Sequence, residues 1–134
     1  MSSILALDVG QARIGVALAS RSAGIASPLT TLANDDNFAG KLQELLGSHT
    51  VDTVVVGLPR GLDGQNTPQT DYVLTFAKNL QNTTSISVVL QDEALTSVKA
   101  EEELEARGKA YTKEDVDALS ATYILEDYLQ GGSA

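Results

Sequence analysis

A carboxylate inside the first apolar run is the feature that most constrains the fold of this chain. Residues 4–9 are apolar except for Asp8, and an ionised group in such a run is costly unless hydrogen-bond donors or a cation compensate it. Gly10 and Gly15 predict a tight turn between two strands, the second of which covers residues 13–19. The sequence therefore places Asp8 on a paired, central strand close to a hairpin turn.

The next two segments predict a third strand and a first helix. Residues 23–29 indicate a turn and a shorter strand, which would complete an antiparallel meander. Asn34, Asp35 and Asp36 offer N-cap oxygens. Apolar residues at helical spacing follow as far as Gly47, and they are Phe38, Leu42, Leu45 and Leu46.

Two later apolar runs predict parallel strands. Residues 51–56 and 86–90 carry little polar alternation, which is typical of strands buried on both faces at the centre of a sheet. Between them, residues 57–66 form a long connection, and Thr67 caps a helix that has Pro68 at its first position. We therefore expect an α/β fold with a five-stranded mixed sheet, an antiparallel meander plus parallel strands, flanked by helices.

Two acidic residues follow these strands. Glu93 stands just past the strand at residues 86–90, at the sheet edge where ligands of open α/β sheets bind, although it also fits a solvated residue before a helix. In the last helix, Thr112 and Asp115 have capping-box spacing, which explains Asp115. Asp117 instead begins a largely apolar helix face, so it is an inward-facing acid that needs a partner.

Three carboxylates thus lack an ordinary structural explanation as a set, namely Asp8, Glu93 and Asp117. Carboxylate oxygens are the ligands that Mg²⁺ prefers, with waters and substrate phosphate completing its coordination. One or two such ions would activate a water and stabilise the leaving oxygen in phosphodiester hydrolysis. The set therefore predicts a magnesium site.

Length and charge limit the remaining possibilities. The 134 residues fit a single domain, 1–134, and the absence of cysteine excludes a disulfide scaffold and thiolate metal sites. Without a signal-like N-terminus or a membrane-spanning run, we expect a cytoplasmic protein with no membrane partner. Because the net charge is −9, binding of a phosphate backbone must rely on cations or on a local basic rim.

Four blocks in order across nearly the whole chain match a known family. They are Asp8-Val9-Gly10 with residues 13–17, Val55-Val56-Gly57-Leu58-Pro59 with Asp63-Gly64, Asp92-Glu93 with Leu95-Thr96, and Val116-Asp117-Ala118 with residues 120–121 and 124–125. Together they resemble the YqgF (RuvX) family of pre-16S rRNA nucleases, also described as Holliday junction resolvase-like, with an RNase H-like fold.

The resemblance implies that Asp8, Glu93 and Asp117 form the acidic triad of a nuclease that uses Mg²⁺ or Mn²⁺. It implies an endonuclease acting on structured RNA in 5′-end maturation of pre-16S ribosomal RNA. Candidate contacts to the nucleic-acid backbone are Arg13, Arg60 and Lys113.

The chain departs from the family at two positions, and other functions stay open. Ala12 and Ala94 stand where such families usually carry a basic residue, so positive charge is missing beside the predicted site. One alternative is a nuclease for branched DNA, and another is an RNase H-like binding module that cleaves weakly. An actin-like nucleotide binder is disfavoured because such proteins need two lobes. The protein is expected to be a monomer or a homodimer.

Overall fold

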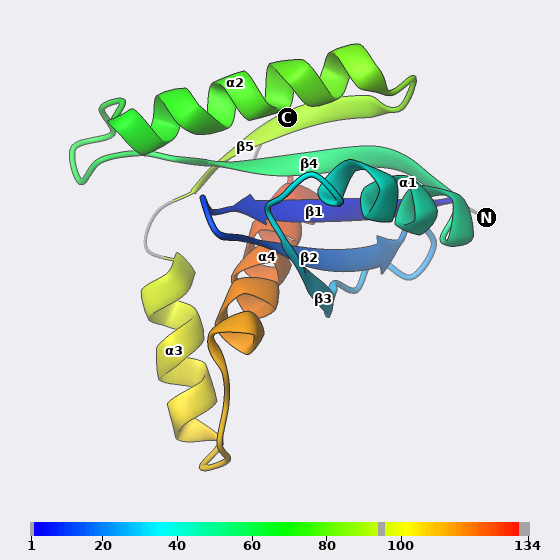
Figure 1. Ribbon diagram of the computed structural model, residues 1–134. Coiled ribbons are helices and arrows are strands. Elements are labelled where there is room, and N and C mark those ends of the chain that lie inside the picture. The colour runs from blue at the N-terminus through cyan, green and yellow to red at the C-terminus, as the bar shows by residue number, and fades with distance from the viewer. Residues whose placement is uncertain (1, 94–95, 132–134) are drawn as a thin grey trace.

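The computed structural model describes residues 2–93 and 96–131, and a five-stranded sheet is its central element (Figure 1). The strands lie in the order β3-β2-β1-β4-β5. β1 pairs antiparallel with β2, and β2 with β3, whereas β1, β4 and β5 are mutually parallel. The predicted meander plus parallel strands is therefore confirmed. Strand bounds are β1 Ser3–Val9, β2 Arg13–Ser20, β3 Ser27–Ala33, β4 Val51–Pro59 and β5 Ser87–Glu93.

Helices cover both faces of the sheet. Their bounds are α1 Phe38–Ser48, α2 Pro68–Thr83, α3 Thr96–Ala106 and α4 Lys113–Leu129. α1 and α2 pack on one face through a core that includes Leu5, Leu7, Val54 and Val56, whereas α4 packs on the other through Ile124 and its neighbours. In Figure 1, α3 (yellow) extends away from the sheet beside α4, and a third apolar cluster joins the two helices.

The third strand differs from the prediction in its position. It covers residues 27–33, whereas we predicted a turn and a shorter strand within residues 23–29, and with seven residues it is as long as β1. Gly24, with φ of +66°, belongs to the turn after β2, and its N–H donates to the carbonyl of Ser20. The β-branched Thr30 and Thr31 pair with β2 at a half-buried sheet edge, a position that such residues suit.

The first helix is capped differently from the expectation. Its N-cap residue is Asn37, which makes no side-chain cap bond, and the helix ends at Ser48, one residue past Gly47. Asp35 instead accepts a bond from the N–H of Asn37, and Asn34 donates to the carbonyl of Gly10. The predicted cap oxygens at residues 34–36 therefore do not cap α1. By contrast, both side-chain caps of α2 and α4, at Thr67 and Thr112, are confirmed.

β4 and β5 extend further than predicted, and β5 lies at the edge of the sheet. β4 continues through residues 57–59, and β5 through residues 91–93, because the two strands stay paired as far as Pro59 and Glu93. In the described residues β5 pairs with β4 alone, so it is an edge strand and not the central strand we expected. A short apolar run looks the same in sequence at either position.

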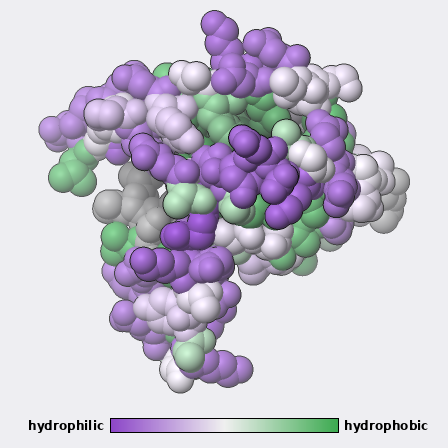
Figure 2. Space-filling view, viewed as in Figure 1, coloured by the Kyte–Doolittle hydropathy of each residue, from purple (hydrophilic) through white to green (hydrophobic). Residues whose placement is uncertain are grey.

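An apolar groove lies between α1 and α2. Figure 2 shows a green surface between the two helices, where the groove of about 230 Å³ is lined by residues such as Phe38, Leu42, Phe76 and Leu80. The rings of Phe38 and Phe76 pack against each other with their centroids 5.7 Å apart.

None of the helices in the described ranges combines the length and apolar character needed to cross a bilayer.

A buried hydroxyl in α4 leads to a stability prediction. Ser120 is fully buried, and within the described part of the chain its Oγ has no hydrogen-bond partner. We expect Ser120→Ala to raise the free energy of unfolding by about 1 kcal/mol, because the variant removes the desolvation cost of the hydroxyl. Denaturant unfolding measures the difference.

Thr122 provides the matched control in the same helix. Its hydroxyl is also buried, but it donates to the carbonyl of Ala118 at 2.9 Å. Thr122→Val is therefore expected to cost about 1 kcal/mol. A loss of stability in Ser120→Ala equal to that of the control would show that the Ser120 hydroxyl is satisfied in solution.

Candidate active site

The first predicted site residue, Asp8, lies near the carboxyl end of the central strand. It pairs with Gly15 of β2, while the preceding residue, Leu7, pairs with Val56 of β4. Asp8 is partly buried, unlike the fully buried residues before it. Because a glycine follows Val56 on β4, strands on both sides of Asp8 present glycine at its level. The sheet therefore leaves space around this carboxylate.

The helix α4 occupies that space on the Gly15 side. A Cβ added to Gly15 would lie 1.9 Å from the carbonyl oxygen of Asp117 and 3.0 Å from the nitrogen of Ala118. Thr31 of β3 also donates from its hydroxyl to the carbonyl of Glu114 at 2.6 Å. The start of α4 thus rests directly on β2, which brings Asp117 beside Asp8.

The capping box sets where this helix starts. The Thr112 N–H donates to Asp115 Oδ2 at 2.9 Å, and the Asp115 N–H donates to Thr112 Oγ1 at 3.2 Å. These bonds satisfy backbone donors that the first turn of a helix leaves free. With the start fixed there, Asp117 turns toward the sheet, as predicted from its place on the inner face.

The third acid, Glu93, reaches the site from the edge strand. It is the last residue of β5, paired with Pro59, and not a residue past the end of the strand. A Cβ added to Gly57 would lie 3.0 Å from Glu93 Oε1 and 2.4 Å from the Ile124 side chain. The side chain of Glu93 therefore lies over β4 at Gly57, in the direction of β1.

Glu93 and Asp117 act electrostatically on Asp8. The pKa of Asp8 is raised from 3.8 to about 8, first by burial and then by the negative charges of Glu93 and Asp117. Such a site favours a bound cation, because a cation offsets both the burial and the repulsion. An all-carboxylate donor set also has the chemistry that a hard divalent cation prefers.

These residues fit a divalent cation in chemistry but not yet in geometry. Among the residues that the structure describes, no group of three or more Asp, Glu, His or Cys side chains is arranged to hold one metal ion. Asp117 is engaged elsewhere, because its Oδ2 accepts a bond from Arg13 Nε at 2.6 Å. Arg13 of β2 is therefore the partner that the sequence led us to expect for Asp117, the inward-facing acid of α4.

The predicted basic residues differ in their surroundings. Arg60 forms an ion pair with Asp92, Nε to Oδ1 3.3 Å, and also bonds to the side chain of Asn66. Lys113 is the exposed first residue of α4, on the same helix end as Asp117. Of the two departures from the family pattern, Ala12 is exposed in the hairpin turn, whereas Ala94 lies outside the described residues.

Two polar side chains that we did not single out position the backbone after Asp8. Gln69 of α2 donates from Nε2 to the carbonyl of Val9 at 3.0 Å, and Asn34 donates from Nδ2 to the carbonyl of Gly10 at 2.8 Å. Both bonds join segments far apart in the sequence. No local pattern indicates them, and they fix the end of β1 at the acidic site.

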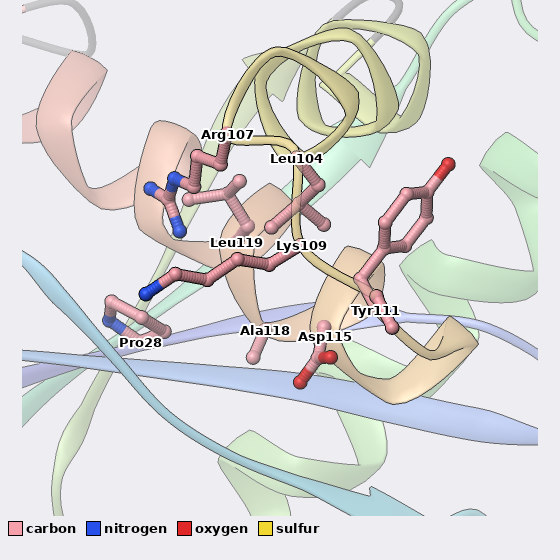
Figure 3. A pocket seen from close by; sticks show the side chains of 9 residues that line it. Pro28, Leu104, Arg107, Lys109, Tyr111, Asp115, Ala118 and Leu119 are labelled. Atoms are coloured by element: carbon pink, nitrogen blue, oxygen red, sulfur yellow. The ribbon is translucent and has the colours of Figure 1, made fainter.

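A well-defined pocket lies apart from the acids, between the α3–α4 connection and the start of β3 (Figure 3). Its volume is about 260 Å³, and Leu104, Ala118 and Leu119 form part of its apolar lining. Figure 3 shows the Lys109 side chain extending across it toward Pro28. None of the three predicted acids lines this pocket, so it is distinct from the candidate active site.

Two solved structures illustrate the fold that this chain shares with resolvases. One is a complex of RuvC from T. thermophilus with a Holliday junction substrate, which matches with a TM-score of 0.60 and 16% identity over 100% of this chain and 98% of that one. Another is a fowlpox virus resolvase in complex with Holliday junction DNA, with a TM-score of 0.55 and 12% identity over 98% and 99%. These likenesses confirm the RNase H-like fold.

Sequence relatives match at higher identity. A protein of Sulfurihydrogenibium sp. with the name "Putative pre-16S rRNA nuclease" is 38% identical over 96% of this chain and 90% of its own length. A protein of Chloroflexus aurantiacus with the same name is 42% identical over 94% and 85%. The family model described as "RuvX: Holliday junction resolvase" matches residues 2–131. With a match over nearly its whole length, the chain belongs to the RuvX family.

Proposed function

We propose that the protein is a metal-dependent endonuclease that hydrolyses phosphodiester bonds in the 5′-end maturation of pre-16S ribosomal RNA. The observation that carries this proposal is the convergence of Asp8, Asp117 and Glu93 around the end of β1, where two glycines make room for them. The relatives named for pre-16S rRNA supply the substrate class. Residues 1–134 are then one nuclease domain, working in the cytoplasm where this precursor is made.

We assign the three acids to the metal. Asp8, Glu93 and Asp117 would hold Mg²⁺ or Mn²⁺, and the raised pKa of Asp8 supports this assignment because cation binding favours the ionised form. The bound metal would supply an activated water and charge stabilisation at the leaving oxygen. Because metal binding then requires Asp8 to lose its proton, we expect affinity for the ion to rise with pH up to about 8.

We assign substrate positioning to the basic residues around the acids. Arg13 and Arg60 flank the site from β2 and from the connection after β4, and Lys113 extends from the exposed start of α4. Their role is to contact backbone phosphates, which fixes the register of the nucleic acid without reading its sequence. Since the net charge is −9, these local cations and the metal must overcome long-range repulsion of the substrate.

A cleavage assay tests the proposal and its alternatives. Purified protein is incubated with a 16S precursor RNA that carries its 5′ extension, and separately with a four-way DNA junction, in Mg²⁺, Mn²⁺ or EDTA. We expect cleavage of the RNA extension with either metal and none in EDTA. Cleavage of the DNA junction alone would favour the branched-DNA nuclease that the family description suggests. Binding without cleavage of either substrate would favour the weakly cleaving module.

A further inference from the structure

The ion pair between Arg13 and Asp117 engages a carboxylate that we assign to the metal. Arg13 Nε lies 2.6 Å from Asp117 Oδ2, and the side chains are 36% and 21% exposed. Glu114, one turn earlier on the same helix, also attracts the Arg13 guanidinium. The guanidinium repels a second cation at the same carboxylate and holds the Asp117 side chain toward β2, so the two cations compete for Asp117.

The absence of a closed metal site agrees with this competition. In the described ranges no three acidic or imidazole side chains are arranged around one ion, although Asp8 is near enough to Asp117 to be affected by its charge. The backbone of Arg13 is anchored, because its carbonyl accepts a bond from the Gly10 N–H at 2.9 Å, while its side chain is partly exposed and can rotate into solvent. A rearrangement of side chains alone would therefore free Asp117.

We propose that Arg13 is a substrate-released latch: without nucleic acid it holds Asp117, and a backbone phosphate draws it away so that Asp117 joins Asp8 and Glu93 on the metal. This inference rests on the proposed function. The exchange is chemically balanced, because a guanidinium forms paired hydrogen bonds with phosphate as well as with carboxylate. A partly exposed ion pair contributes little to stability, so breaking it is inexpensive. The latch couples metal binding to substrate binding.

Metal affinity measured without nucleic acid tests the latch. We expect Arg13→Gln to bind Mn²⁺ about three- to fivefold more tightly than the wild type by titration calorimetry or electron paramagnetic resonance, because the competing cation is gone. Arg60→Gln is the matched control, since it removes the same charge from a residue paired with Asp92. We expect the control and the conservative variant Arg13→Lys to stay within about twofold of the wild type. Equal or weaker Mn²⁺ binding by Arg13→Gln would overturn the latch.

An NMR measurement on the wild-type protein tests the latch even if Arg13→Gln does not fold. The Nε–Hε resonance of Arg13 reports its bond to Asp117, and we expect it to move when Mg²⁺ saturates the protein or when RNA is added. A resonance that stays unmoved when RNA is added at saturating Mg²⁺ would overturn the latch alone. Failure of the wild type and Arg13→Gln to bind either metal would overturn the metal-dependent function as well, so the two failures are distinguishable.

Discussion

Asp8→Asn is expected to abolish cleavage and at the same time to make the protein more stable at pH 8. Loss of a residue that only orients a metal ligand typically costs 10–100-fold in activity, so loss of the ligand itself should cost more than about 100-fold. The fold should survive, because asparagine has the same shape and carries no charge into a partly buried position between two other acids.

The stability gain follows from the pKa of Asp8. In the unfolded chain this carboxyl ionises near 3.8, whereas in the folded protein it keeps its proton up to about pH 8. Between these two pH values the folded state binds more protons than the unfolded state, so the free energy of unfolding of the wild type falls as pH rises. Asparagine does not titrate, so the variant does not lose stability in this way. Because Asp8 is only partly buried, we expect a gain of about 2 kcal/mol at pH 8 and almost none at pH 4.

Thermal unfolding of the two proteins across this pH range measures the gain. A difference of about 2 kcal/mol corresponds to roughly 8 °C in Tm for a chain of this length. Mg²⁺ provides the control, since at pH 8 it should raise the Tm of the wild type but not that of Asp8→Asn. An identical difference in Tm at pH 4 and pH 8 would contradict a raised pKa for Asp8.

Gly15→Ala is expected to cost about 3 kcal/mol of stability and to abolish cleavage. The new Cβ would lie 1.9 Å from the carbonyl oxygen and 2.3 Å from the carbonyl carbon of Asp117. Because these are backbone atoms of α4, the clash cannot be relieved by a side-chain rotation, and the helix must move off β2. Asp117 then separates from Asp8, which should also lower the pKa of Asp8.

Two other glycines serve as controls for this variant. A Cβ at Gly57 meets the ends of the Ile124 and Glu93 side chains, which can rotate, so Gly57→Ala should cost about 1 kcal/mol. Gly40, inside α1, has nothing within 4 Å, and Gly40→Ala should stabilise by about 0.5–1 kcal/mol. Denaturant unfolding gives all three values. Full activity in Gly15→Ala would mean that Asp117 does not need this close approach.

Local patterns were sufficient for much of the fold and for the choice of acids. The hairpin around Gly10 and the capping residues Thr67 and Thr112 are set by neighbouring residues, and the structure confirms them. Asp8 and Asp117 could be singled out because each is an acid on an apolar element. Their assignment to a metal stays a prediction, which the experiments above address.

What the sequence did not predict depends on contacts between distant segments. The edge position of β5 is decided by which strand pairs with β4, and the register of β3 by its pairing with β2. The ion pair of Arg13 with Asp117 joins the second strand to the last helix. The role of Gly15 was predicted only as part of a turn, whereas its larger effect is the close approach of α4.

The dependence of the site on α4 has a consequence for synthesis of the chain. Asp8 and the hairpin that follows it are made early and have local partners, whereas Asp117 arrives only after most of the chain has been translated. Domains fold largely as they emerge, so a growing chain would carry a sheet with an incomplete acid set until α4 docks on Gly15. With the function that we propose, the growing chain would have no activity against RNA near the ribosome until α4 has been translated.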